Sequence, residues 1–115
     1  MNDGFFPPKP EISPKIYAYR DTNPSYDGLL KVGFTTQEVA KRVAQQYPTV
    51  RPGGTPYAIL MEEQAVYDDG NSFTDHDVHR QLRKMGFENP GGEWFRCSKD
   101  DVKAAIIALR SGTEN

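Results

Sequence analysis

The sequence has a single cysteine, no long apolar run and no excess of positive charge. Because Cys97 is the only cysteine among 115 residues, a disulfide within the chain is excluded and a reducing, cytoplasmic location is expected. The apolar runs are a few residues long, too short for a membrane-spanning helix. Residues 1–14 also lack the apolar segment of a secretory signal. We therefore expect a cytoplasmic protein with no membrane partner.

The charge balance limits how the chain would bind nucleic acid. The 14 Lys and Arg residues are outnumbered by 16 Asp and Glu residues, which gives a formal net charge of −2. Domains that bind DNA by general electrostatic attraction usually carry a basic excess. DNA binding would therefore depend on a local basic patch, or on further domains of a longer protein.

The rest of the composition is typical of one globular domain, with 37% hydrophobic and 26% charged residues. Residues 1–14 contain four prolines and predict an extended arm. Residues 111–115 are small or polar and predict a flexible tail. The folded domain is expected over residues 15–110.

Two β-rich segments joined by a turn-rich loop predict a hairpin: residues 15–20 and 29–34. Alternation along the first segment separates Ile16 from Tyr17, and along the second it separates Val32 from Lys31. If Ile16 and Val32 face the core, Tyr17 and Lys31 share the opposite face.

Helices and strands alternate in the remainder of the domain. A capping box of Thr35 and Glu38 predicts a helix that begins there and ends at Pro48. The later elements are a strand at 57–62, a helix capped by Thr74 or Asp75 and ended by Gly86, a strand at 93–97 and a helix capped by Ser98. The order β-β-α-β-α-β-α predicts an α/β (α+β) fold, with a small, mostly antiparallel sheet of three to four strands flanked by helices.

Apolar residues at helical spacing mark the predicted buried faces of the last two helices. The first stripe is Val78, Leu82 and Met85, and the second is Val102, Ala105, Ile106 and Leu109. Trp94 and Phe95 are expected to anchor the last strand in the core.

Short motifs occur along these elements in a fixed order. The hairpin carries Lys15-Ile16-Tyr17 and then Lys31-Val32-Gly33, and Arg42 follows on the next helix. A later helix has Asp75 four residues before His79, and a Gly-Glu-Trp-Phe string comes after it. In this order and spacing the chain resembles the GIY-YIG endonuclease superfamily, in particular its phage-type branch, over about residues 15–110.

The resemblance implies a divalent-metal-dependent endonuclease that hydrolyses phosphodiesters of DNA, as a module of a larger DNA-processing or restriction-type protein. It assigns Tyr17 as the general base or the residue that positions water, and Lys31 and Arg42 as stabilisers of the phosphate. It further assigns Asp75 as the ligand of Mg²⁺ or Mn²⁺, with His79 near the scissile phosphate.

These residue types suit that chemistry. Arginine makes bidentate contacts to phosphate, as Arg42 would. Mg²⁺ keeps most of its waters and takes one or two carboxylates, so Asp75 alone is an adequate protein ligand. A tyrosine of ordinary pKa, near ~10, is a poor base, so nearby positive charge would have to stabilise its phenolate.

Each candidate also has an ordinary structural interpretation. Tyr17 fits packing on a strand face, Lys31 fits a solvated strand residue, and Arg42 fits a surface side chain. Asp75 fits a helix-capping acid as well as it fits a ligand. For His79, a buried, hydrogen-bonded histidine is as consistent with the pattern as a role near the phosphate.

Glu93 fits either a second carboxylate of the site or the structural partner of a basic residue, and the second interpretation is favoured. Whether Asp75 or Glu93 holds the metal is left open by the sequence. A zinc site of His76, His79 and Cys97 is disfavoured, because the two histidines are expected to point apart and no second cysteine completes the set.

The alternative function is a catalytically degenerate DNA-binding or protein-interaction module. Three departures from the superfamily motifs favour it: Lys15 for glycine, Lys31 for tyrosine and Asp75 for glutamate. The acidic charge balance favours it as well.

Overall fold

The computed structural model describes residues 13–49 and 52–112, and it confirms the predicted order of elements and the α+β fold class. The strands in these ranges are β1 (Lys15–Asp21), β2 (Leu29–Thr35), β3 (Tyr57–Gln64) and β4 (Trp94–Arg96). The helices are α1 (Val39–Ala44), α2 (Asp75–Lys84) and α3 (Lys99–Ser111), with a 3₁₀ turn, η2 (Pro24–Tyr26), between β1 and β2. Residues 1–12 of the predicted arm and residues 113–115 of the predicted tail lie outside the described residues.

The strands form one sheet in the order β3-β1-β2-β4, and each neighbouring pair is antiparallel. The predicted hairpin is the central pair, with Tyr17 opposite Gly33 and Ala18 opposite Val32. β4 is short and pairs with β2 only from Leu29 to Lys31. Beyond Lys31, no described strand pairs with the outer edge of β2. One backbone hydrogen bond continues past this residue, from the Val32 amide to the Glu93 carbonyl (2.9 Å).

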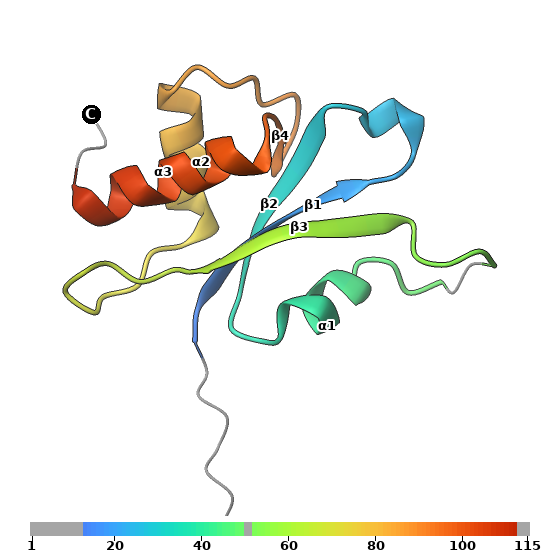
Figure 1. The fold of residues 1–115 in the computed structure, drawn as a ribbon, viewed down its shortest axis with the longest axis horizontal. Helices are drawn as coiled ribbons and strands as arrows, with labels where there is room; N and C mark the ends of the chain where they lie inside the picture. The colour runs from blue at the N-terminus through green and yellow to red at the C-terminus, as the bar shows by residue number, and fades with distance from the viewer. Residues whose placement is uncertain (1–12, 50–51, 113–115) are drawn as a thin grey trace, which may run out of the picture.

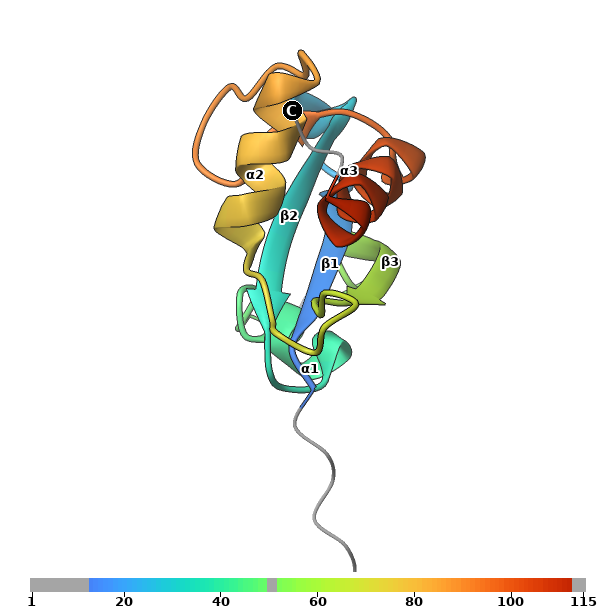
Figure 2. The same ribbon diagram turned by 90° about the vertical axis from the view of Figure 1, so that its left-hand side faces the viewer.

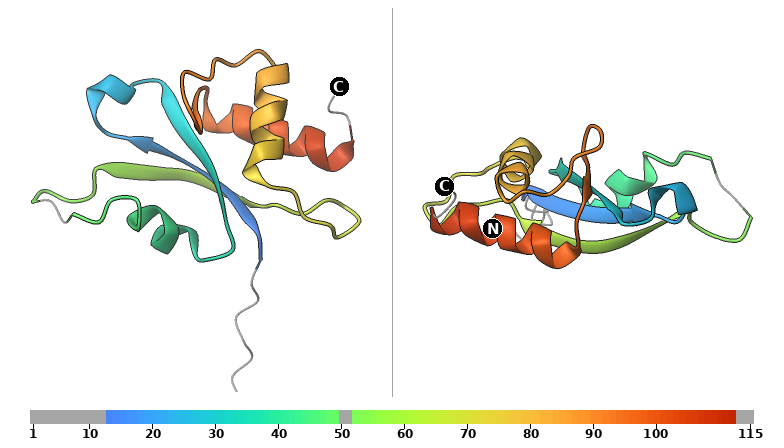
Figure 3. Two further views of the ribbon diagram at one scale, coloured as in Figure 1. Left: turned by 180° about the vertical axis from the view of Figure 1, so that it is seen from behind. Right: turned by 90° about the horizontal axis from the view of Figure 1, so that it is seen from above.

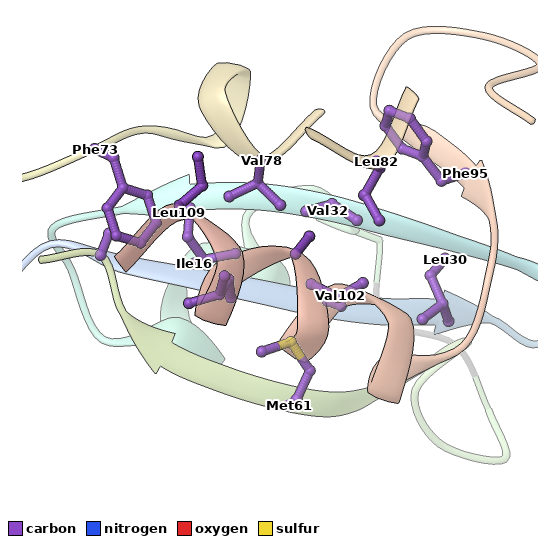
Figure 4. Packing of buried hydrophobic residues seen from close by; sticks show 14 residues of the cluster. Ile16, Leu30, Val32, Met61, Phe73, Val78, Leu82, Phe95, Val102 and Leu109 are labelled. Atoms are coloured by element: carbon purple, nitrogen blue, oxygen red, sulfur yellow. The ribbon is translucent and has the colours of Figure 1, made fainter. Parts of the chain in front are cut away.

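Helices cover both faces of the sheet, but unequally. α2 and α3 lie together on one face and α1 lies on the other (Figures 1 and 2; Figure 3, right). The α2–α3 face holds the larger core, in which Ile16 and Val32 pack against side chains of both helices such as Leu82 and Val102 (Figure 4). Burial of such side chains contributes about 1.5–3 kcal/mol each to folding.

The opposite face holds a smaller core under the single helix α1. Its buried members are Tyr17, Tyr19, Val39 and Val43. The predicted alternation of the hairpin thus separates two cores, and Tyr17 lies on the α1 face.

The two long helices begin as predicted. Ser98 caps α3 in a capping box with Asp101, and Thr74 caps α2 in a capping box with Asp77. Gly86 follows α2 with φ of 93°, a left-handed conformation that favours glycine. The prediction that Met85 lies in the core is wrong, because α2 ends at Lys84 and Met85 is 40% exposed. Phe87, after the glycine turn, packs against that core instead.

The predicted capping box of Thr35 and Glu38 is also wrong. Thr35 is the last residue of β2, paired with Lys15, and its Oγ1 accepts a hydrogen bond from the Gln37 amide (2.9 Å). α1 begins only at Val39, with Glu38 as an N-cap that makes no side-chain cap bond. Sheet pairing of Thr35 therefore overrides the local capping signal, and the helix is six residues long.

A bulge in β3 changes which side chains face the two cores. Ala18 pairs with Met61 but Tyr19 pairs with Ile59, so Leu60 is an extra residue on β3. As a result Met61 and Leu60 both pack in the larger core, and Ile59 packs in the smaller one.

The structure also bears on the predicted ends of the domain. The Pro14 carbonyl accepts a hydrogen bond from the Ala65 amide (2.8 Å), so pairing reaches one residue into the predicted arm. α3 continues to Ser111 and is ended by Gly112 in a left-handed conformation. Within residues 13–49 and 52–112, no helix has the length and apolar character needed to cross a membrane.

Candidate active site

Tyr17 lies flat against the strand that pairs with it. Its side chain is 2% exposed and stacks on Tyr19, with ring planes 9° apart and centroids 6.2 Å apart. On Gly33, a Cβ atom would lie 2.4 Å from Cζ and 2.5 Å from Oη of Tyr17, far inside van der Waals contact. The glycine of the second motif therefore makes room for the tyrosine of the first.

A glutamine that follows α1 connects Tyr17 to its neighbours. Gln46 Nε2 donates to Tyr17 Oη (2.9 Å), and Gln46 Oε1 accepts from Tyr19 Oη (2.7 Å). The same oxygen also accepts a hydrogen bond from Lys31 Nζ. The amide thus joins the side chains of two strands on the α1 face.

Lys31 lies between this amide and a carboxylate. Its Nζ is 4.0 Å from Glu93 Oε1, and it lies 5.8 Å from the centre of the Tyr19 ring. Glu93 is thereby the partner of a basic residue, as predicted, and its carboxylate acts electrostatically on Tyr17 as well.

Arg42 has the least engaged cationic group of the site. It is half-buried on α1, and among the described residues its guanidinium makes one long hydrogen bond, to Gln45 Oε1 (3.4 Å). Its remaining donors are available to an anion, because a guanidinium carries five N–H groups. Its charge acts on both Tyr17 and Lys31.

Asp75 is the first residue of α2 and is not its cap. Thr74 is the N-cap and Asp77 accepts from its amide, so Asp75 does not cap the helix; it is an acid of the first turn, a position that the helix macrodipole favours. In the described part of the chain its carboxylate makes no hydrogen bond or ion pair. Its charge acts electrostatically on Tyr17 and Lys31.

The same three charged groups act electrostatically on Tyr17 and on Lys31: Arg42, Asp75 and Glu93. A cleft of about 330 Å³ between the β1–β2 loop and the start of α3 has none of them in its lining.

Burial controls the protonation of Tyr17 and Lys31. Burial raises the pKa of Tyr17, the Gln46 bond and Arg42 lower it, and the carboxylates of Glu93 and Asp75 raise it again, so the net direction is upward. For Lys31, burial lowers the pKa, Glu93 and Asp75 raise it and Arg42 lowers it, with a net lowering. A Tyr17 phenolate would need nearby positive charge to stabilise it, and desolvation outweighs the effect of the positive charge present.

His79 makes a structural hydrogen bond with one of its two ring nitrogens. It is 4% exposed, its Nε2 lies 2.7 Å from the Val32 carbonyl oxygen, and its ring packs 5.1 Å from that of Phe95. A carbonyl only accepts, so Nε2 carries a hydrogen and cannot bind a metal or take up a proton. This contact fits the interpretation of His79 as a buried, hydrogen-bonded histidine. The predicted role near a phosphate would then have to be carried out by the other ring nitrogen, Nδ1.

We expect His79→Ala to destabilise the domain by about 1–3 kcal/mol, because the Val32 carbonyl loses its partner in a buried position. A denaturant melt measures the change. His76→Ala is the control, since His76 is exposed on the same helix and its removal should cost less than about 0.5 kcal/mol. Equal stability of both variants would show that the His79 bond contributes nothing.

The prediction that His76 and His79 point apart is wrong. The rings of His76 and His79 lie 5.8 Å apart rather than pointing away from each other, because residues three apart are neighbours on a helix. Burial raises the pKa of Cys97 to about 11, so its thiol is protonated at neutral pH. Among the described residues, no three His, Cys, Asp or Glu side chains gather closely enough to hold a metal ion by themselves.

Gln46 is the site residue that the sequence argument missed. A signal was present, because Gln46 follows Val39 by seven residues and Val43 by three, which is the spacing of the buried side of the helix predicted up to Pro48. A polar residue at such a position needs partners, and here they are Tyr17, Tyr19 and Lys31.

Comparison with known proteins identifies a domain family. The family model of the T5orf172 domain matches residues 16–110, which run from β1 to α3. Neither the curated proteins nor the solved structures contain a match to the chain.

Proposed function

Because the chain belongs to the T5orf172 domain family, we propose that it is a nuclease domain that hydrolyses DNA phosphodiesters with the help of a divalent metal ion. The family comprises phage-associated domains, commonly nuclease-like or DNA-binding modules, that are related to GIY-YIG-like or HNH-like nuclease folds. The observation that carries the proposal is that the Arg42 guanidinium and the uncommitted carboxylate of Asp75 both act electrostatically on Tyr17 and Lys31.

The cations of the site support phosphate binding. Arg42 keeps free donors for a bidentate phosphate contact, while Lys31 is held in place by Gln46 and Glu93. Fixed positive charge directed at a phosphoryl oxygen stabilises the charge that develops there during hydrolysis. The carboxylates of Glu93 and Asp75 act on the same groups and limit the net charge of the site. This fits a domain that shares DNA binding with other parts of a longer protein.

The donor set fits a hard divalent cation such as Mg²⁺ or Mn²⁺. Asp75 offers a carboxylate that no described residue engages, and Glu93 lies near the same groups. One or two carboxylates with water and phosphate oxygens make a usual magnesium site. When bound, the ion would supply positive charge to the phosphate and a water that ionises more readily. Asp75 is the proposed ligand, and Glu93 is the second choice.

The test is a plasmid-nicking assay with Mg²⁺ or Mn²⁺ that compares the wild type with Arg42→Ala. Loss of the guanidinium should reduce nicking about 10²-fold, as expected for removal of one charge-stabilising group. Lys41→Ala is the matched control, because Lys41 is an exposed cation on the same helix and should keep nearly full activity. If the wild type binds DNA but cleaves none with any divalent ion, the alternative of a DNA-binding module replaces the nuclease.

A further inference from the structure

The amide of Gln46 has only one possible orientation. Its oxygen accepts hydrogen bonds from Lys31 Nζ and Tyr19 Oη. Its nitrogen lies 2.9 Å from Tyr17 Oη and 3.5 Å from the Arg42 carbonyl oxygen. An ammonium group has hydrogens to donate and no lone pair to accept, so the atom that meets Lys31 must be the oxygen. The ion pair of Lys31 with Glu93 favours that charged form.

This orientation decides the direction of the next hydrogen bond. Gln46 Nε2 has two hydrogens, one for the Arg42 carbonyl and one for Tyr17 Oη. Tyr17 Oη therefore accepts, and its own hydrogen points elsewhere. In the described part of the chain, Gln46 is the side-chain hydrogen-bond partner of Tyr17, so this hydrogen is left for an acceptor from outside.

From this geometry we infer that Gln46 is a positioning residue that makes Tyr17 a hydrogen-bond donor to an anionic oxygen of the scissile phosphate, and not a general base. The inference rests on the proposed function for the identity of the acceptor. The direction of the Gln46–Tyr17 hydrogen bond does not depend on the proposed function.

The surroundings of Tyr17 support a donor. Its side chain is buried beneath the α1 face, and burial favours the neutral phenol. The charged groups that act on it are Arg42 from α1, Glu93 beside β4 and Asp75 from α2, and two of these three are carboxylates that disfavour a phenolate. A buried donor without an acceptor costs about 1–3 kcal/mol, which an incoming phosphate oxygen would remove.

The first experiment measures the bond direction without any catalysis. The protein is labelled with 3-fluorotyrosine, and the Tyr17 signal in the ¹⁹F spectrum is assigned by its loss in Tyr17→Phe and titrated with pH. Gln46→Met removes the N–H that stabilises the phenolate, so the Tyr17 ionisation constant should fall about tenfold, a rise of about one pKa unit. An unchanged or lowered pKa would mean that Gln46 accepts from Tyr17, and it would overturn the inference.

Two further variants keep this experiment decisive. Gln46→Leu also removes the N–H and repeats the measurement if Gln46→Met does not fold; an unchanged or lowered Tyr17 pKa again overturns the inference. Tyr19→Phe removes a donor to the opposite end of the amide and leaves the bond to Tyr17, so it should shift Tyr17 by much less.

The second experiment follows nicking against pH. With a Tyr17 donor, activity falls as pH rises through the Tyr17 pKa, and Gln46→Glu loses as much activity as Tyr17→Phe at every pH, because the carboxylate draws the hydrogen inward. If Tyr17 is a general base, the pH dependence is reversed: nicking rises with pH, and the Gln46→Glu variant regains activity at high pH. This result would overturn the inference. If the wild type does not nick DNA, the proposed function fails while the fluorine titration still decides the bond direction.

Discussion

Replacement of Asp75 by asparagine should abolish DNA nicking and leave the stability of the domain nearly unchanged. Asparagine keeps the size of the side chain and removes the charge that a divalent cation needs. Since no described residue bonds to the Asp75 carboxylate and the capping bonds of α2 are made by Thr74 and Asp77, the substitution breaks no fold contact. The measurement is nicking with Mg²⁺ or Mn²⁺ beside a thermal melt of the same preparation.

Asp77→Asn is the matched control for this prediction, two residues along the same helix. Its carboxylate accepts from the Thr74 amide (2.9 Å) and pairs with Arg80 (2.7 Å), so the substitution should lower stability by about 0.5–2 kcal/mol and spare nicking. Burial raises the pKa of Asp77, but the Thr74 amide and Arg80 lower it more, so its folded pKa lies below the ordinary value. Its stabilisation is therefore full at neutral pH and is lost as pH falls through that lowered pKa.

The pair of variants separates catalysis from folding. Full nicking by a stable Asp75→Asn protein would exclude Asp75 as the ligand and move the metal to Glu93. Loss of stability in Asp75→Asn equal to that in Asp77→Asn would mean that Asp75 has a structural role that its contacts do not explain.

Substitution of Gly33 by alanine should both destabilise the domain and impair the site. The new methyl group would lie 2.4 Å from Tyr17 Cζ, a contact that the ring cannot keep. Tyr17 has little room to yield, because it stacks on Tyr19 and is held by Gln46. Overpacking of this kind costs about 1–3 kcal/mol, or about 4–20 °C in melting temperature for a domain of this size. Nicking should fall at least as far as in Tyr17→Phe, since the hydroxyl loses its position.

Gly91→Ala is the control for the glycine substitution, because a Cβ there meets no atom within 4 Å. It should melt within about 0.5 kcal/mol of the wild type. A double-mutant cycle then isolates the contact: in a Tyr17→Leu background, the smaller side chain leaves space for the methyl group, so Gly33→Ala should cost much less. A Gly33→Ala protein as stable as the wild type would show that the Tyr17 ring does not lie against this glycine.

The sequence by itself determined the elements that local rules govern. Alternation with a period of two placed Tyr17 and Lys31 opposite Ile16 and Val32, because successive strand residues point to opposite faces. The cap at Ser98 was equally predictable, since a capping box joins residues three apart and needs no distant contact. The stop at Gly86 follows from the left-handed backbone that glycine permits.

Tertiary structure alone decided the features that depend on segments far apart in the chain. Pairing with Lys15 made Thr35 a strand residue instead of a helix cap, and the bulge at Leu60 arose from the pairing of β3 with β1. Gln46 gained its role from side chains on two strands that it meets only in the fold. The protonation of Tyr17 belongs to the same class, because the cost of desolvating a phenolate is set by everything packed around it, and a sequence motif does not contain that quantity.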